Sequence, residues 1–296
     1  MDFQLLKNKT YIVTGATGFI GSNLVEKLLK HGANIIAIIH KKKPVHNIIE
    51  SIKFDGTYDS IYKPLENKRI DGIIHLATMF LSKHKADQIG DLIDSNIKFG
   101  TFLLEVAKNK QIPFFVNTTT YAQSFDHNGY NPQNLYAATK QSFEDIIKYY
   151  EVDSEISFTT LELTDTYGKG DTRPKFINQL LKAIEYDSTF KMSKGEQEIN
   201  YLNIEDASDS FITAINLIQK GDIGSGEHFS VYSNETYKLI DLVNFVRSKL
   251  NSNILIENGY YPYRNREIMT FKPSYTKLPN WNAKVSLMEG IYTIIK

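Results

Sequence analysis

Cysteine is missing from this chain of 296 residues, and long hydrophobic runs are missing as well. Without cysteine, the protein can form neither disulfides nor thiolate metal sites. Its longest apolar runs, such as residues 35–39, are far too short to span a bilayer. Residues 1–10 lack the apolar core of a signal peptide. We therefore expect a soluble, cytoplasmic protein without a membrane segment.

An excess of charge of one sign is also missing, because 34 Lys and Arg residues balance 34 Asp and Glu residues. A nucleic-acid-binding domain would favour a basic face, so the neutral balance gives no support for that class of partner. No histidine cluster has the spacing of metal ligands, and we expect isolated histidines such as His75 to be structural. Metal, nucleic acid and membrane are thus absent from the expected partners.

What the chain does contain is an alternation of apolar, strand-like segments with amphipathic, helix-like segments. We expect strands at residues 11–13, 34–39, 71–77, 114–116 and 157–163, and helices at residues 21–30, 93–108 and 135–150. Strands that are apolar throughout are typical of a parallel sheet covered by helices on both faces. The pattern therefore predicts an α/β fold with a Rossmann-type, doubly wound parallel sheet.

After residue 165 this alternation loosens. The expected elements are helices at 176–184, 207–218 and 239–250 and a strand at 228–231. The length leaves room for one large α/β domain and a smaller lobe. We expect that lobe in the C-terminal part of the chain.

A glycine-rich turn joins the first expected strand to the first helix. It reads Gly15-Ala16-Thr17-Gly18-Phe19-Ile20-Gly21. Gly15 permits the tight turn, Gly18 lets the backbone approach a pyrophosphate at the positive end of the helix dipole, and Gly21 allows close helix packing. A turn without a ligand is the alternative. Its place between a β-branched strand and an amphipathic helix favours a dinucleotide.

The end of the second expected strand bears on the choice between NAD and NADP. An acid there hydrogen-bonds the ribose 2′-hydroxyl of NAD, whereas basic residues accommodate the 2′-phosphate of NADP. The strand ends in Ile39-His40-Lys41-Lys42-Lys43, with no acid. A solvated lysine loop would look the same, but we favour NADP(H) over NAD(H).

Tyr136 and Lys140 are spaced to lie on one face of a helix. A free tyrosine has a pKa of about 10. We expect the nearby ammonium, helped by an oxidised nicotinamide cation, to lower this pKa and to make Tyr136 a usable acid or base. Tyr292 and Lys296 share this spacing, but only Tyr136 follows a strand that ends in hydroxyls. Ligands bind at the carboxyl ends of parallel strands. The hydroxyls belong to Thr118, Thr119 and Thr120.

Several further motifs follow in order along nearly the whole chain. They are Asp55-Gly56, His75-Leu76-Ala77-Thr78, Asn96-Ile97-Lys98-Phe99-Gly100-Thr101, Leu163-Thr164-Asp165-Thr166-Tyr167-Gly168, and Trp281 followed by Val285 to Gly290. Together with the glycine turn and the Tyr136/Lys140 pair, they resemble the extended short-chain dehydrogenases/reductases, the NAD-dependent epimerase/dehydratase family that acts on nucleotide sugars. Residues 117–120 and 134–141 look most similar to synthases of CDP-abequose and CDP-paratose, which are 4-ketoreductases.

The resemblance implies a role for each matching residue. Tyr136 would donate a proton, Lys140 would bond the nicotinamide ribose, and Thr119 would hold the carbonyl oxygen, unless a one-residue shift gives that role to Thr118. Substrate contacts would come from Thr120, Asp165, Asn200 and Arg264. Cofactor contacts would come from Gly15, Thr17, Gly18, Phe19, Ile20, Gly21, His40, Lys41, Lys42, Asp55, Gly56, Leu76, Ala77, Thr78, Asn96, Lys140 and Thr166.

Three departures from the family pattern narrow the implied chemistry. Relatives that dehydrate sugars carry an acid directly after the catalytic threonine, and none stands here, which disfavours dehydration. Ile199 occupies the place of an arginine that contacts the substrate phosphate, and the later arginine is retained as Arg264. Asp165 stands where many relatives have Asn.

The implied function is an NADPH-dependent reduction of a nucleotide-linked 4-keto-6-deoxy or 3,6-dideoxy hexose, for surface polysaccharide such as O-antigen. Residues 1–165 plus about 200–235 would bind the cofactor, and about 166–199 plus 236–296 would form a substrate-binding lobe. A homodimer would pack through the helices at 93–108 and 135–150. The alternatives are a nucleotide-sugar 4-epimerase with tightly bound NAD, a reductase of another ketone, and a non-catalytic NAD(P)-binding regulatory module.

Overall fold

The computed structural model describes residues 2–40 and 50–295, and its centre is a parallel sheet of seven strands. The strands lie in the order β11-β6-β5-β4-β1-β2-β3, and every neighbouring pair is parallel. This confirms the expected doubly wound α/β fold. The strand bounds are β1 Thr10–Thr14, β2 Asn34–Ile39, β3 Glu50–Lys53, β4 Gly72–His75, β5 Phe114–Thr120, β6 Ser157–Leu163 and β11 Glu227–Val231.

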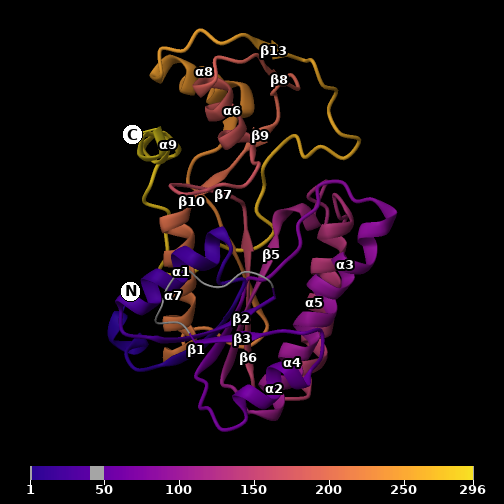
Figure 1. Ribbon diagram of the computed structural model, residues 1–296, viewed down its shortest axis with the longest axis vertical. Coiled ribbons are helices and arrows are strands. Elements are labelled where there is room, and N and C mark those ends of the chain that lie inside the picture. Colours follow the sequence, from indigo (N-terminus) through magenta and orange to yellow (C-terminus); the bar gives the residue numbers. More distant parts are fainter. Residues whose placement is uncertain (1, 41–49, 296) are drawn as a thin grey trace.

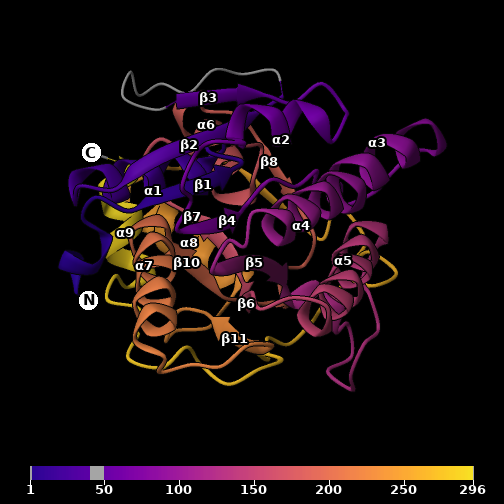
Figure 2. The same ribbon diagram turned by 90° about the horizontal axis from the view of Figure 1, so that it is seen from below.

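Helices cover both faces of this sheet (Figure 2). On one face lie α1 (Phe19–Lys30) and α7 (Ile204–Lys220); on the other lie α2 (Asp59–Leu65), α4 (Phe99–Asn109) and α5 (Leu135–Val152). Side chains alternate between the two cores, so that Tyr11 and Val13 face α1 and α7 while Ile12 faces α4 and α5. Because both faces are buried, the central strands β1, β2 and β4 are mostly apolar.

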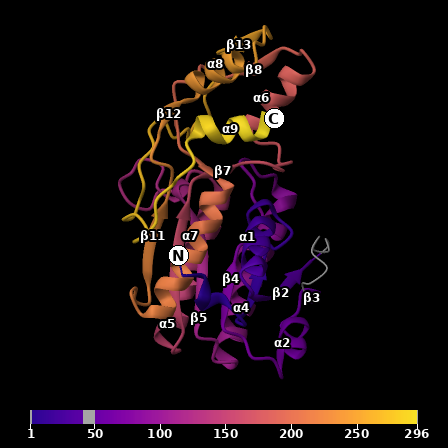
Figure 3. The same cartoon turned by 90° about the vertical axis from the view of Figure 1, so that its left-hand side faces the viewer.

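A second, smaller group of elements stands above the carboxyl ends of the strands (Figures 1 and 3). Its helices are α6 (Phe176–Glu185), α8 (Leu239–Lys249) and α9 (Leu287–Ile295), and they share a third apolar core. Three two-stranded sheets accompany them, formed by β7 (Asp165–Tyr167) with β10 (Tyr201–Asn203), β9 (Glu198–Ile199) with β12 (Tyr237–Lys238), and β8 (Phe190–Met192) with β13 (Ile256–Asn258). The division into a cofactor domain and a substrate lobe at the expected boundaries stays a prediction.

The strongly periodic segments were predicted within a few residues, and the short or polar ones were not. The helix expected at 93–108 begins earlier, with α3 (Ile89–Ile93), and passes through a π-helical turn (Asp94–Lys98) before α4. The strand expected at 114–116 continues to Thr120. β3 has only one buried residue, Ile52, and the strands of the lobe have two or three residues each, too few to show a period.

In the part of the chain that the structure describes, no helix is long and apolar enough to cross a membrane. The same residues bring no three His, Asp or Glu side chains together as a set that could hold a metal ion.

Candidate active site

The carboxyl ends of β1 and β4 are tied together by Thr14. Its hydroxyl lies 2.8 Å from Nδ1 of His75 and accepts hydrogen bonds from the backbone N–H groups of Leu76 and Ala77 at 3.2 and 3.1 Å. Gly15 follows with a φ of +68°, and a Cβ there would lie 2.8 Å from the backbone nitrogen of Ala77. The predicted glycine turn and the predicted segment 76–78 are therefore in contact and form one surface at the carboxyl ends of β1 and β4.

The glycine turn leaves the first turn of α1 open to an anion. Gly18 is the N-cap of α1 and provides no side chain to bond the first N–H groups, which belong to Phe19, Ile20 and Gly21. A Cβ on Gly21 would overlap the carbonyl of Gly15, so the helix packs as closely as glycine allows. Free N–H groups at the positive end of a helix dipole suit a pyrophosphate, so the turn, with Thr17 at its centre, fits the expected dinucleotide.

The ends of β2 and β3 lie next to this turn in the sheet order. Phe54 donates its backbone N–H to the carbonyl of Ile39 at 2.8 Å, which brings Asp55 and Gly56 beside the exposed His40. The carboxylate of Asp55 accepts from the N–H and hydroxyl of Thr57 at 2.9 and 2.6 Å. Its side chain is thus used in a turn before α2. Lys41 and Lys42, on which the NADP(H) expectation depends, lie outside the described residues.

Asn96 sits in the π-helical turn and connects three parts of the site. Its Oδ1 accepts from the Thr78 hydroxyl and the Met79 N–H at 3.0 and 2.7 Å, and its Nδ2 donates to the Met79 carbonyl and the Thr139 hydroxyl, both at 3.0 Å. All amide positions are engaged within the protein. Asn96 therefore holds the segment after β4 against α5, and a direct cofactor contact stays a prediction.

Tyr136 and Lys140 are both buried on the inner face of α5, with exposed fractions of 9% and 2%. The ring of Phe80 meets the ring of Tyr136 edge-on, with centroids 5.0 Å apart. Burial raises the pKa of Tyr136 to about 12, and the charge of Asp165 adds to this while a hydrogen bond with Thr78 opposes it. In the protein by itself the pKa is thus raised, because desolvation of the phenolate dominates. The expected lowering by Lys140 together with an oxidised nicotinamide stays a prediction.

Lys140 has its pKa displaced in the opposite direction. Burial lowers the pKa of Lys140 to about 8, and the charge of Glu144 opposes that change. Among the described residues, no hydrogen bond to the ammonium contributes to this pKa. A buried ammonium without an acceptor is costly. The hydroxyl groups of a nicotinamide ribose would supply acceptors, so Lys140 also fits the expected cofactor.

The three threonines at the end of β5 face different partners. Thr118 donates its hydroxyl to the carbonyl of His75 at 3.0 Å, and Thr119 donates to Oε1 of Gln123. Thr120 caps the short helix Tyr121–Gln123 by accepting from the Ala122 N–H at 3.3 Å. Both Thr118 and Thr119 are buried, so the choice of the catalytic threonine stays open between them.

The expected substrate contacts spread over the entrance to the lobe. Asp165 pairs with Lys175 at 2.8 Å, and the hydroxyl and carbonyl of Thr166 accept from Arg173 at 3.1 and 2.7 Å. Asn200 is buried with its amide bonded to Thr164, Ser233 and Glu235. The Arg264 side chain is 64% exposed and lies 3.8 Å from Glu267. Contacts of Asp165, Asn200 and Arg264 with a substrate, and of Thr166 with the cofactor, stay predictions.

Three residues near the site were missed from the sequence: Phe80, Arg173 and Lys175. The guanidinium of Arg173 lies 4.4 Å from the ring centroid of Phe19, in the glycine turn. The ammonium of Lys175 lies 4.4 Å from the ring centroid of Phe80, which contacts Tyr136. Both cations therefore lie in the segment before α6 and reach residues next to the glycine turn and to Tyr136. The only signal in the sequence is their position in a short charged stretch after Tyr167-Gly168.

The fold and the site together define an oxidoreductase-type nucleotide-binding enzyme, and the family comparison agrees. A model of the NAD dependent epimerase/dehydratase family matches residues 11–231. The chain therefore belongs to that family and is an NAD(P)-dependent enzyme. The CDP-abequose synthase of Salmonella typhimurium is 28% identical over 96% of this chain and 97% of its own. That of Yersinia pseudotuberculosis is 29% identical over 96% and 99%. The resemblance inferred from the motifs is confirmed.

Solved structures show the same fold at lower sequence identity. A UDP-glucose 4-epimerase from Thermus thermophilus in complex with NAD superposes with a TM-score of 0.82, covers 97% of both chains and is 17% identical. This likeness supports an NAD(P)-binding fold. It leaves the preference for NADP(H) untested.

Proposed function

We propose that this protein is an NADPH-dependent reductase of a nucleotide-linked 4-keto-6-deoxy or 3,6-dideoxy hexose. The observation that carries the proposal is that Tyr136 lies buried at the carboxyl edge of the sheet, and that no acid follows the threonines at the end of β5. A phenol that holds its proton at neutral pH can give that proton to a strong base such as an alkoxide. The similarity to two CDP-abequose synthases over nearly the full chain supports this class of substrate.

The protein's own groups would act on the oxygen of the ketone. A bound nicotinamide cofactor would supply the hydride to C4. As negative charge grows on the carbonyl oxygen, Tyr136 donates its proton and a threonine hydroxyl, from Thr119 or Thr118, stabilises the charge by a hydrogen bond. Lys140 stabilises the phenolate that remains. Phe80 covers the ring of Tyr136 and limits the access of water.

The lobe adds positive charge where a sugar diphosphate would need it. Arg173 and Lys175 stand at the start of α6, and both bond to carboxylates, those of Asp171 and Asp165, each at 2.8 Å. A bound diphosphate would replace these carboxylates as the hydrogen-bond partner of the two cations. We infer that the two residues replace the phosphate contact that Ile199 cannot make. Asp165, Thr120, Asn200 and Arg264 remain the proposed contacts with the rest of the substrate.

One specific observation supports a second candidate function, that of a nucleotide-sugar 4-epimerase. The Thermus enzyme with this fold is an epimerase that holds NAD. An epimerase would retain its nucleotide through purification and would consume none, whereas a reductase would consume NADPH in proportion to product. We expect the purified protein to turn over a nucleotide-linked 4-keto deoxyhexose only when NADPH is added, and to leave a simple aromatic ketone unchanged. Turnover without added cofactor, accompanied by bound NAD, would favour the epimerase.

The cofactor preference can be measured separately from turnover. Three lysines follow His40 in the sequence, and basic residues after the second strand of this fold accommodate the 2′-phosphate of NADP. Hydrogen bonds to charged groups contribute about 1.5–3 kcal/mol, so NADPH should bind about tenfold or more tightly than NADH in calorimetric titrations. A clear preference for NADH would contradict the assignment. Replacing Lys41 and Lys42 with Ser should reduce binding of NADPH and leave binding of NADH nearly unchanged.

A homodimer and the two-part division of the chain complete the proposal. The proposed dimer packs through the helical segments 93–108 and 135–150, which contain α4 and most of α5 and expose apolar side chains such as Ile93 and Tyr149. These helices lie side by side on one side of the molecule (Figure 2). They would meet the same helices of a second copy. The cofactor would occupy the part built on residues 1–165 and 200–235, and the sugar nucleotide the part built on residues 166–199 and 236–296.

A further inference from the structure

Glu144 is a buried carboxylate that the proposed reaction has not used. It lies on α5 one helical turn after Lys140 and is 3% exposed. Its Oε1 accepts from Nε2 of Gln123 at 3.0 Å, and its Oε2 lies 3.2 Å from Nε2 of His228 on β11. A carboxylate buried to this degree is tolerated only when its oxygens are bonded, and both are. Glu144 is therefore fixed between α5, the short helix after β5 and the edge strand of the sheet.

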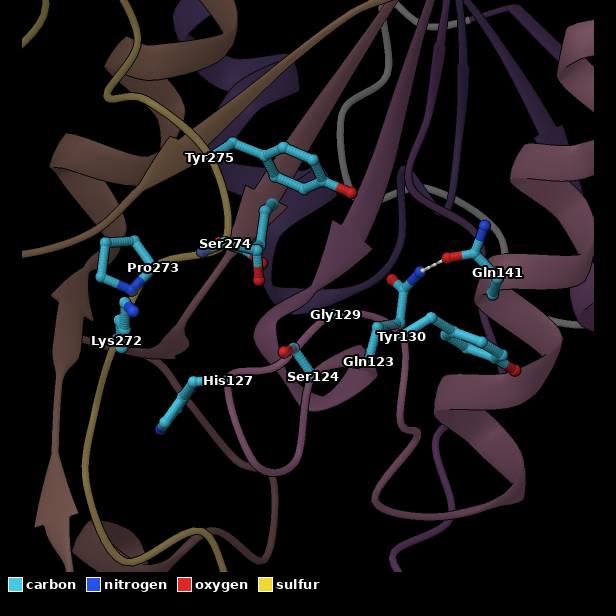
Figure 4. Close-up of a pocket in the computed structure, with 11 residues that line it drawn as sticks. Gln123, Ser124, His127, Gly129, Tyr130, Gln141, Lys272, Pro273, Ser274 and Tyr275 are labelled. Atoms are coloured by element: carbon cyan, nitrogen blue, oxygen red, sulfur yellow. Dashed lines mark hydrogen bonds between the residues drawn. The ribbon is translucent and has the colours of Figure 1, made fainter.

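Gln123 connects Glu144 to Thr119, at the end of β5, by hydrogen bonds. Its Nε2 donates to Glu144 and also to Oε1 of Gln141 at 2.8 Å, a bond drawn as a dashed line in Figure 4. Its Oε1 accepts from the hydroxyl of Thr119. With the amide nitrogen bonded to two acceptors, the amide oxygen is left to face Thr119. The direction of the Thr119 hydroxyl thus follows from the position of Glu144.

His228 keeps Glu144 charged. Burial by itself would raise the pKa of Glu144, but its hydrogen bonds with His228 and Gln123 outweigh burial and hold the pKa below its ordinary value. The same contact raises the pKa of His228 against the effect of its own burial. The histidine ring also packs on Tyr275, with centroids 5.0 Å apart. His228 thus contacts Glu144 through its Nε2 and Tyr275 through its ring, which fixes its position.

The remaining titratable groups around Glu144 and Lys140 come from other elements. Burial, with the Lys140 charge adding to it, lowers the pKa of His75 on β4 well below its ordinary value, so this ring is neutral. Tyr275 borders a cavity of about 270 Å³ together with Gln123, Gln141 and Glu162 of β6 (Figure 4). Lys148, further along α5, lowers the pKa of His228 slightly. Among the described residues, Glu144 is the negative charge that acts on Lys140.

We propose that Glu144 is a positioning residue of the active site, whose carboxylate fixes Gln123 and through it Thr119, and which is the counter-charge of Lys140. The proposal rests on the proposed function, because it takes Tyr136, Lys140 and Thr119 as the reacting groups. Glu144 itself touches neither cofactor nor substrate. Its effect is transmitted by one hydrogen-bonded amide and by charge across one helical turn.

The proposal predicts a changed pH profile in Glu144→Gln, which keeps the shape of the side chain and removes its charge. Without that charge the proton on Lys140 is lost at lower pH, so the alkaline limb of kcat/KM should move down by about one pH unit. The matched control is Asp145→Asn at the next, exposed position of α5. It removes a charge but keeps the Oδ1 that accepts from Gln141 at 3.1 Å, so it should leave the limb unchanged. A lowered melting temperature with an unshifted limb in Glu144→Gln would mean a structural role and would overturn the proposal.

A second variant and a second measurement keep the two proposals separable. Gln123→Met breaks the link to Thr119 while Glu144 keeps its charge, so kcat should fall about tenfold and the alkaline limb should stay at the same pH. A kcat equal to wild type would refute the positioning of Thr119.

The titration of Lys140 can be followed without any substrate by NMR of lysines labelled at Cε, with Lys140 assigned by comparison with Lys140→Met. A midpoint that stays in place in Glu144→Gln refutes the counter-charge. Failure of the wild type to reduce a keto sugar refutes only the proposed function.

Discussion

Tyr136→Phe should lower kcat for the reduction of a nucleotide-linked 4-keto sugar by about two to four decades, the usual contribution of a positioned acid. The phenylalanine keeps the ring that Phe80 packs against and removes only the hydroxyl. Burial raises the pKa of Tyr136 to about 12 and so favours the protonated phenol, the form that donates in the reduction. Single-turnover measurements with excess enzyme would show whether the chemical step is the one slowed.

Tyr292→Phe is the matched control for this loss. Tyr292 has the same spacing to a lysine four residues later, but it lies on α9 in the lobe and is 42% exposed. Its replacement should leave kcat and the melting temperature nearly unchanged. A Tyr136→Phe enzyme that reduces the keto sugar at the wild-type rate would show that the proton comes from another group.

Lys140→Met should separate activity from stability, by lowering kcat/KM by about two to three decades while raising the free energy of unfolding at neutral pH. The loss of activity is that expected for removing a group that stabilises developing charge. The gain follows from burial, which lowers the pKa of Lys140 from 10.5 to about 8. Such a difference corresponds to about 3 kcal/mol that the folded state spends on keeping the buried ammonium charged, and methionine fills similar space without charge.

The sign of this effect can be checked by varying pH. Between pH 8 and about 10.5 the unfolded chain holds the proton of Lys140 and the folded chain has lost it, so the stability of the wild type rises through this window. The advantage of Lys140→Met in denaturant unfolding should therefore shrink as the pH rises. Lys148→Met, on the exposed face of α5, is the control and should change neither quantity. A destabilised Lys140→Met would mean that the lysine is needed to offset the buried charge of Glu144 or to fill its place in the packing.

The sequence was most informative where one regular pattern determined the structure. The glycine turn, the buried strands and the spacing of Tyr136 and Lys140 depend on neighbours in the chain, and the structure places them at one edge of the sheet. The direction of the pKa of Tyr136 could not be predicted, since it depends on burial by segments such as the loop of Phe80. Spacing shows which groups share a face and does not show how much water reaches them.

The other missed features are contacts between segments far apart in the chain. Arg173 reaches Phe19 from the lobe, and His228 meets Glu144 across 84 positions. No local pattern marks either residue, because each acts through a partner that only the fold supplies. Asn96 and Asn200 are the reverse case. The family resemblance predicted them as ligand contacts, but the structure shows them bonded to other parts of the protein. Their amides are occupied by protein partners, so their visible role is to hold the loops around the site.

Transfer of deuterium is the most direct test of reduction at C4. The protein would be incubated with a nucleotide-linked 4-keto-3,6-dideoxyhexose and NADPH carrying deuterium at the transferred position, and the product would be examined by mass spectrometry and NMR. We expect one deuterium at C4 of the sugar for each NADPH oxidised, with none in the Tyr136→Phe reaction over the same time. A sugar product that contains no deuterium, formed while NADPH stays unconsumed, would contradict the assignment as a 4-ketoreductase.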